Sequence, residues 1–223
     1  MKYFLYFSAF FVVLSCARPP ELDNVPKISF ENIAFREVPN LQDELILDIY
    51  FEDGDGNLGL HPEETYPPYN ERLEITDDFG DYYTYPASDT FPEYNVSDWL
   101  IRREVIGTNT TRVIDTIYAP LNPDHFNIFV DFYTFVNGNR VLFDFTKELN
   151  IRGYDGRFPI LFDDIENDRA LEGNLRYLMK SSGWLNTFSI DSLQLEIYIQ
   201  DRALNKSNTI TTPKFTLLGI QIN

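Results

Sequence analysis

An alternation of apolar and polar side chains occurs twice in this 223-residue chain and ends both times in an aspartate-containing turn. The first run, residues 45–51, leads into the sequence DGDGNLG at 53–59. The second run, residues 193–200, leads into DRALNKSN at 201–208. A period of two residues is typical of a β-strand with one buried face. The pattern therefore predicts two core strands, each followed by an Asp on the buried side.

Similar short runs, separated by Gly, Asn and Pro turns, continue along the chain, and no segment shows a sustained helical period. Ten or so short strands with such turns favour an all-β fold, an immunoglobulin-like antiparallel β-sandwich with inserted loops and hairpins. One helical turn is expected at 163–169. The predicted strands are 27–36, 44–52, 72–76, 99–106, 111–118, 126–136, 140–146, 158–162, 173–180, 193–200 and 210–222.

The composition suits a single β-sandwich domain over residues 27–223. Hydrophobic residues make up 43% of the chain and aromatic residues 16%, which is enough for one packed core. The segment from about 62 to 124 has a weak core pattern and many prolines and tyrosines. It is predicted to be an elaboration of the sandwich and not a second domain.

The N-terminus has the pattern of an exported protein. Lys2 precedes an apolar run at 3–13, which is too short to span a bilayer, so residues 1–15 are predicted to be a signal peptide. The sequence Leu14-Ser15-Cys16 resembles the lipobox of bacterial lipoproteins. That resemblance implies cleavage before Cys16, lipidation (palmitate among the acyl chains) and a tether over 16–26. A plain secretory signal with a buried Cys is the alternative.

The net charge of −17 limits the classes of partner. An acidic surface repels phosphate backbones, so nucleic acid is excluded as an expected partner, while cations and basic protein surfaces are favoured. Solubility alone also explains such a charge.

The two aspartate turns contain candidate metal ligands. Asp53, Asp55 and Asn57 are alternating oxygen-bearing residues, and Ca²⁺ prefers oxygen ligands. If the two core strands end at the same edge of the sandwich, Asp201 joins these residues, and Asn205 with Asn208 adds amide oxygens. The sequence thus indicates a calcium site. The alternative is a cluster neutralised by Arg202 and Lys206, which lie in the same loop.

The segments 53–59 and 197–208 carry a resemblance to a family. They are similar to the DGDGD-L/I-G and DRAxNKSN turns of Bacteroidetes outer-membrane lipoproteins that share a signal and a lipobox. Asn57 stands where that family has Asp. The resemblance implies an envelope-anchored, immunoglobulin-like β domain and implies no reaction.

Catalytic motifs are missing from the sequence. His61 and His125 lie in loops beside prolines, and no nucleophile elbow, zinc-protease helix or phosphate loop occurs. The adjacent acids at 77–78 and 163–164 leave a carboxylate-based hydrolase as a weak alternative. The chain is therefore predicted not to be an enzyme.

Aromatic residues in the 62–124 segment suggest binding. Tyr82, Tyr83, Tyr85 and Trp99 are expected either to form an exposed platform for sugars or a protein, or to cover the sandwich as a secondary core. Two further sites, Thr116 and Ser192, follow an Asp and precede a hydrophobic residue, and resemble O-glycosylation acceptors of Bacteroidetes.

These observations predict a non-catalytic accessory or structural subunit of an outer-membrane protein complex, with other envelope proteins as partners. The alternative function is a surface glycan-binding lipoprotein. The residues after Cys16 lack the acidic cluster of a surface-export signal, which favours the periplasmic face of the outer membrane over the cell surface.

Overall fold

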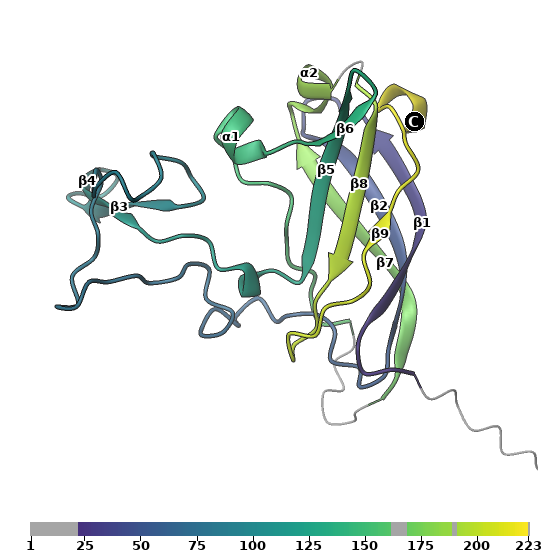
Figure 1. Cartoon of the computed structure of the whole chain (residues 1–223), viewed down its shortest axis with the longest axis horizontal. Helices are drawn as coiled ribbons and strands as arrows, with labels where there is room; N and C mark the ends of the chain where they lie inside the picture. The colour runs from purple at the N-terminus through teal and green to yellow at the C-terminus, as the bar shows by residue number, and fades with distance from the viewer. Residues whose placement is uncertain (1–21, 162–168, 189–190, 223) are drawn as a thin grey trace, which may run out of the picture.

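The computed structural model describes residues 22–161, 169–188 and 191–222. Strands account for 42% and helices for 8% of the structure. Two four-stranded sheets pack face to face, and a two-stranded sheet stands apart from them (Figure 1). The predicted all-β sandwich is confirmed, while its immunoglobulin-like character stays a prediction. None of the described helices has the length and apolar composition that crossing a bilayer requires.

The first sheet has the strand order β10-β1-β2-β7. It contains β1 (Lys27–Arg36), β2 (Asp43–Asp53), β7 (Leu171–Ser181) and the short β10 (Gln221–Ile222). β2 pairs with both β1 and β7 in antiparallel register, and the predicted irregularity in the first strand is a register shift between Phe30 and Asn32. β10 pairs with β1 in parallel.

The second sheet has the order β6-β5-β8-β9, and all its pairs are antiparallel. Its strands are β5 (Ile128–Val136), β6 (Asn139–Leu142), β8 (Leu193–Ile199) and β9 (Ile210–Thr211). The predicted hairpin of the central segment forms the separate sheet, with β3 (Trp99–Val105) and β4 (Thr111–Tyr118).

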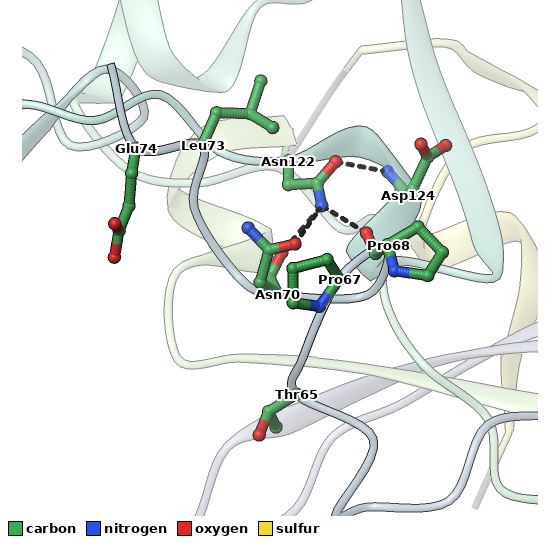
Figure 2. A pocket seen from close by; sticks show the side chains of 8 residues that line it. All are labelled: Thr65, Pro67, Pro68, Asn70, Leu73, Glu74, Asn122 and Asp124. Atoms are coloured by element: carbon green, nitrogen blue, oxygen red, sulfur yellow. Dashed lines mark hydrogen bonds between the residues drawn. The ribbon is translucent and has the colours of Figure 1, made fainter. Parts of the chain in front are cut away.

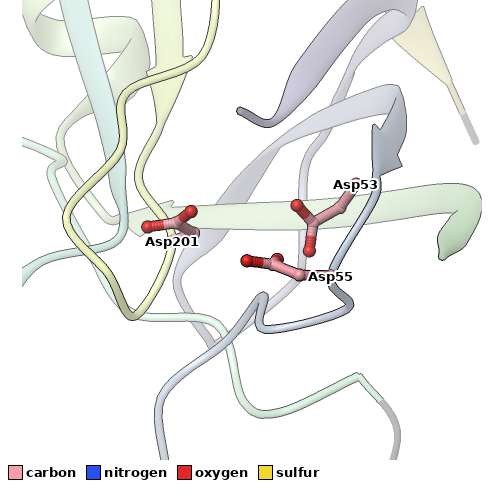
Figure 3. A group of neighbouring side chains, drawn as sticks. All are labelled: Asp53, Asp55 and Asp201. Carbon is pink, nitrogen blue, oxygen red and sulfur yellow. The ribbon is translucent and has the colours of Figure 1, made fainter. Parts of the chain in front are cut away.

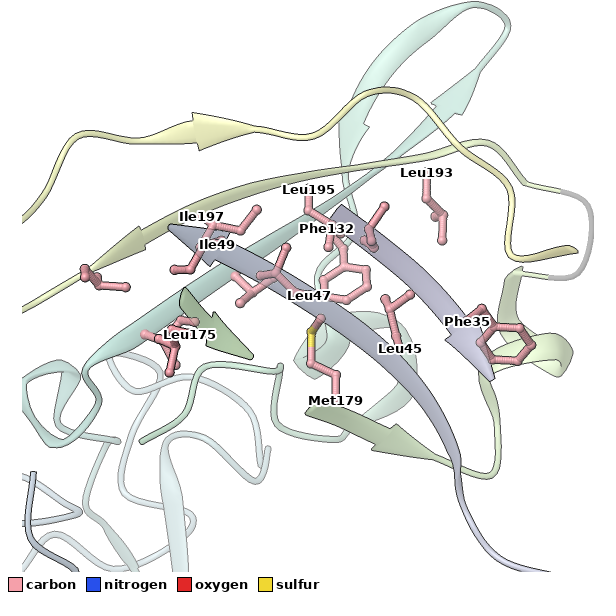
Figure 4. Packing of buried hydrophobic residues seen from close by; sticks show 14 of the residues in the cluster. Phe35, Leu45, Leu47, Ile49, Phe132, Leu175, Met179, Leu193, Leu195 and Ile197 are labelled. Atoms are coloured by element: carbon pink, nitrogen blue, oxygen red, sulfur yellow. The ribbon is translucent and has the colours of Figure 1, made fainter. Parts of the chain in front are cut away.

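The core lies between the two large sheets, and the alternating runs supply most of it (Figure 4). Leu45, Leu47 and Ile49 of β2 are fully buried, and so are the alternate residues of β8 from Leu193 to Ile199. The next residue of the same parity in each run is Asp53 or Asp201, and both are buried as well. The alternation therefore carries one carboxylate from each sheet to the edge of the core.

Three predicted strands are wrong or too long. Residues 72–76 do not form a strand. Arg72 and Thr76 make only single bridges, to Leu121 and Tyr82. The described part of 158–162 is not a strand, since the Asn127 side chain takes up the backbone N–H and carbonyl of Phe158. β6 ends at Leu142, and Asp144 then caps the unpredicted helix α1 (Phe145–Leu149).

The predicted C-terminal strand at 210–222 is broken into pieces. Pro213 lacks the backbone N–H that a continuing ladder needs, so β9 stops at Thr211. The 3₁₀-helix η2 (Leu218–Ile220) precedes β10. A second unpredicted helix, α2 (Trp184–Phe188), follows β7 and buries Trp184 and Phe188. The helical turn predicted at 163–169 falls almost entirely outside the described residues.

The segment 62–124, here called the arm, extends away from the sandwich (Figure 1). Its end carries the β3–β4 hairpin, and the short 3₁₀-helix η1 (Pro123–His125) returns the chain to β5. An aromatic cluster around Trp99 and Tyr118 holds the arm together. The alternative prediction placed these rings over the sandwich. The structure corrects it, because the cluster is a small core that belongs to the arm.

Candidate metal centre

The ends of β2 and β8 bring three carboxylates together at one edge of the sandwich. Asp53 is the last residue of β2, Asp55 lies in the following turn, and Asp201 comes two residues after β8 (Figure 3). One carboxylate oxygen of each residue lies within 4.8 Å of the others. The structure thus brings together the three acids that the sequence places in two distant turns.

Glycines allow the 53–59 turn to fold tightly against its neighbours. Gly56 has φ +68° and Gly59 has φ +96°, both in the region that side chains disfavour. A Cβ at Gly56 would lie 2.2 Å from the Arg169 carbonyl oxygen, and one at Gly59 would lie 2.3 Å from that of Pro159. The glycines are therefore needed where the turn packs against the backbone at Arg169 and Pro159.

Asp53 is the least satisfied group of the centre. The residue is 0% exposed, and neither of its carboxylate oxygens has a hydrogen-bond partner among the described residues. The buried Oδ1 of Asn57 also lacks such a partner, while its Nδ2 donates to Oδ2 of Asp55 at 2.9 Å. Buried polar groups without partners are rare and costly in native proteins. The oxygens of Asp53 and Asn57 are thus placed as ligands of a metal ion would be.

The protonation of Asp53 reflects this environment. Burial, and after it the negative charges of Asp55 and Asp201, raises the pKa of Asp53 to about 7. The nearby backbone amide of Asn57 offsets only part of the rise, and it does not reach the geometry of a hydrogen bond to Asp53. An ionised Asp53 is therefore unfavourable near neutral pH unless a positive charge joins the centre.

Asp201 is fixed by its own loop. Its two carboxylate oxygens accept from the backbone N–H and the side-chain amide of Asn205, at 2.7 and 2.8 Å. Asn205, a predicted ligand, thus supports Asp201 through its amide nitrogen. Asn208 was also predicted to offer an amide oxygen to the metal. Its side chain instead forms two hydrogen bonds with the backbone of Ile28 and so fastens the loop to β1.

The two cations of the loop are directed elsewhere. Arg202 Nη2 donates to Oε1 of Glu64 at 2.5 Å, and Lys206 lies over the rings of Tyr198 and Phe129. Among the described residues no ion pair joins a Lys or Arg to Asp53 or Asp201. The predicted alternative, neutralisation by Arg202 and Lys206, is not what the structure shows.

The donor set fits a hard cation. Three carboxylates and one amide oxygen are all-oxygen ligands, which Ca²⁺ prefers, whereas zinc sites use His and Cys. Asp53, Asp55, Asn57 and Asp201 would hold the ion, and Asn205 would orient Asp201. Such a centre joins the ends of strands from opposite sheets.

A network that the sequence did not reveal links this centre to the arm. The Arg202 backbone N–H donates to the carbonyl of Asn57 at 3.3 Å, and its own carbonyl accepts from the Tyr69 hydroxyl. Glu64 is only 7% exposed and also accepts from the N–H of His61 at 2.6 Å. No sequence pattern predicts the ion pair between Arg202 and Glu64, which lie 138 residues apart.

The four aromatic residues of the platform alternative do not form one exposed surface. Trp99 is 2% exposed and donates through Nε1 to the Pro92 carbonyl, so its place on an exposed platform is a wrong prediction. Tyr83 packs on Phe91, and Tyr85, which is 46% exposed, packs on Trp99. Tyr82 lies apart from them, beneath the Arg102 guanidinium. Tyr83, Tyr85 and Trp99 belong to the aromatic cluster that forms the core of the arm.

The remaining candidate sites are placed only in part. Thr116 is half-buried within β4, where its carbonyl accepts from Tyr85, and the half-buried Ser192 directly precedes β8. Cys16 lies outside the described residues. Comparison of the chain with protein-family models, with curated proteins and with solved structures finds no match.

Proposed function

We propose that this chain is a non-catalytic, lipid-anchored envelope protein that serves as an accessory or structural subunit of an outer-membrane protein complex. Ca²⁺ at Asp53, Asp55 and Asp201 stabilises its sandwich. The observation that supports the metal assignment is the fully buried carboxylate of Asp53, which lies beside two further acids and has no hydrogen-bond partner among the described residues. A bound cation supplies the missing partner.

The role of the ion is structural. It joins the end of β2 in one sheet to the loop after β8 in the other, and its binding favours the folded state by mass action. Catalytic work is not expected at this place, because Asp53 and Asp201 are buried and the cluster contains no His or Cys among the described residues. The ion would also hold the loop that contains Arg202. Through Arg202 it would position the root of the arm, the residues around Glu64 and Tyr69.

The arm is the expected contact with a partner protein. Its hairpin stands away from the sandwich and exposes a group of apolar side chains at its tip. Exposed apolar groups of this kind are typical of interaction surfaces. The group comprises Val105, Ile106, Val113 and Ile114.

A thermal melt of the full-length protein in mild detergent tests the metal. Ca²⁺ at millimolar concentration is expected to raise the melting temperature above that in EDTA, and Mg²⁺ is expected to do so much less. In Asp53→Asn the rise disappears, and the EDTA form becomes more stable than wild type because a buried charge is gone. The matched control is Glu52→Gln, a neighbouring acid on the opposite face of β2.

The metal assignment fails if EDTA and Ca²⁺ give the same melting temperature, or if Asp53→Asn keeps the calcium response. Membrane attachment is tested separately by metabolic labelling with palmitate, which Cys16→Ser should abolish. The subunit role is tested by crosslinking in the native envelope before extraction. Recovery of the protein as a single species without a stoichiometric partner contradicts it.

A further inference from the structure

A pocket of about 430 Å³ lies in the arm between the hairpin and the segments around residues 70–74 and 82. This volume falls within the range of small-molecule sites in proteins. Three arginines line it, Arg72, Arg102 and Arg152. They gather there although the chain has only 18 Lys and Arg against 35 Asp and Glu, and they outnumber the two acids of the lining, Glu71 and Glu74.

The guanidinium groups keep donors that the described residues do not use. Arg102 Nη1 donates to Asp115 at 3.2 Å and Arg152 Nη1 donates to Glu71 at 2.6 Å. Each guanidinium has five N–H donors in a planar fork, so both retain free positions. Their side chains are 43% and 44% exposed and accessible to a ligand.

Arg72 is held more deeply. Its Nη1 and Nη2 donate only to backbone carbonyls, those of Ser97, Ala119 and Val96, and its buried Nε has no partner among the described residues. Burial, and after it the positive charge of Arg152, lowers the pKa of Arg72. An anion bound at Arg152 would offset the positive charge of that group and so relieve the repulsion.

The rest of the pocket is apolar. Ile117 and Ala119 are 4% and 2% exposed and form its floor, and Leu100, 38% exposed, offers an accessible apolar side chain. The Tyr82 ring lies at 5.8 Å from the Arg102 guanidinium. A ligand that fits this surface has an anionic group on one side and an apolar ring face on the other.

A neighbouring pocket of about 730 Å³ gives a contrast (Figure 2). It shares Asn70 and Glu74 with the basic pocket, but its remaining charged side chain is Asp124, and no Lys or Arg lines it. The Asn122 amide there donates to the carbonyls of Pro68 and Asn70 and braces the arm root. The charged side chains that line the larger pocket are therefore all acidic, whereas arginines outnumber acids in the smaller one.

We propose that the basic pocket binds the carboxylate of an acidic sugar residue, a uronic acid. The carboxylate lies between the guanidinium groups of Arg102 and Arg152, whose forks match its geometry. The sugar ring packs on Tyr82 and Leu100. Asn70 and Glu74 on the rim bind its hydroxyl groups.

Titration calorimetry of the full-length protein in mild detergent tests this site with D-glucuronate. The methyl ester of glucuronic acid, D-glucose, acetate and inorganic phosphate serve as comparison probes. Glucuronate is expected to bind, with the neutral ester and glucose at least about tenfold weaker, because they lose a charge-assisted contact. Acetate and phosphate lack the ring and bind more weakly than glucuronate.

Arg152→Gln and Tyr82→Ala are each expected to weaken glucuronate binding at least about tenfold. The control is Arg112→Gln, which removes an arginine of the same hairpin that pairs with Glu104 outside the pocket. Absence of glucuronate binding overturns the proposal, and so does equal binding of glucose or of phosphate. The ester comparison uses only the wild-type protein and decides the matter even if a variant fails to fold.

Discussion

The sandwich and the arm hold buried charge in opposite ways. At the end of the sandwich, Asp53 meets two further carboxylates, and its oxygens accept no hydrogen bond from the part of the chain that the structure describes. In the arm, the guanidinium of Arg72 is embedded among backbone carbonyls, with two more arginines close by. The acid cluster at Asp53 favours the binding of a cation. In the arm, backbone carbonyls stabilise the cation that Arg72 itself supplies. This acidic chain thus has a cluster of acids at the end of its sandwich and a cluster of arginines in its arm.

The two regions also differ in how they are stabilised, which predicts the largest effect. Leu195→Ala removes a fully buried side chain between the two large sheets and should cost about 2–5 kcal/mol of global stability. Trp99→Ala empties the arm core instead. It should release hydrogen-exchange protection within residues 62–124 while the sandwich stays protected.

Chemical denaturation and hydrogen exchange of both variants measure this difference. A loss of protection in β2 and β8 on Trp99→Ala, as large as that in the arm, contradicts the separation of the two cores. Trp99→Phe serves as the milder partner, because it keeps an aromatic ring and loses the hydrogen bond to Pro92.

The next effect concerns pH and the acid cluster. The folded-state pKa of Asp53 is raised to about 7, above its unfolded value of about 4. A raised carboxylate pKa means that the folded state binds the proton more tightly. In EDTA, the stabilisation is therefore full below about pH 4 and is lost as pH rises to about 7. Asp53→Asn should remove this slope.

Calcium should reverse that trend, because it binds the ionised carboxylate and competes with the proton. The gain in melting temperature on adding Ca²⁺ is thus expected to grow between about pH 5 and pH 8. Melts in EDTA and in Ca²⁺ across this range check both statements. A calcium effect that is largest at low pH would be inconsistent with binding at Asp53.

The acid cluster was predictable because strand periodicity fixes the side on which Asp53 and Asp201 emerge. The two runs keep one parity from the core strand into the turn, and the structure buries both residues. The role of Asn205 was not predictable, since its amide presents nitrogen to Asp201. The hairpin of the arm was predictable, whereas the contacts that position the arm were not. Its contacts join residues such as Arg152 and Glu71, 81 positions apart, and no period relates them.

A third effect tests the connection between the two regions. Arg202→Gln leaves Glu64 buried without its cation, and removing one member of a buried ion pair costs about 3–5 kcal/mol where burial is complete. Arg202 is 29% exposed in its side chain, so a smaller loss is expected. Hydrogen exchange should rise at the arm root around Glu64 and Tyr69.

The double variant Arg202→Gln with Glu64→Gln separates the pair from its surroundings. It should recover part of the stability, because the lone buried charge is gone. No recovery, or a rise in exchange confined to the 201–208 loop, would show that Arg202 does not connect the metal centre to the arm.

The smallest effect on stability concerns the exposed side chains of each region. Val105 at the arm tip is 76% exposed and Leu41 in the β1–β2 turn of the sandwich is 74% exposed. Val105→Asp and Leu41→Asp should each change the free energy of unfolding by only about 0.5 kcal/mol or less. If the arm contacts a partner protein, Val105→Asp should reduce the yield of the crosslinked complex, because a charge enters an apolar contact. Leu41→Asp should leave that yield unchanged. Equal yields for both variants would remove the arm tip from the interface and leave the sandwich as the surface to search.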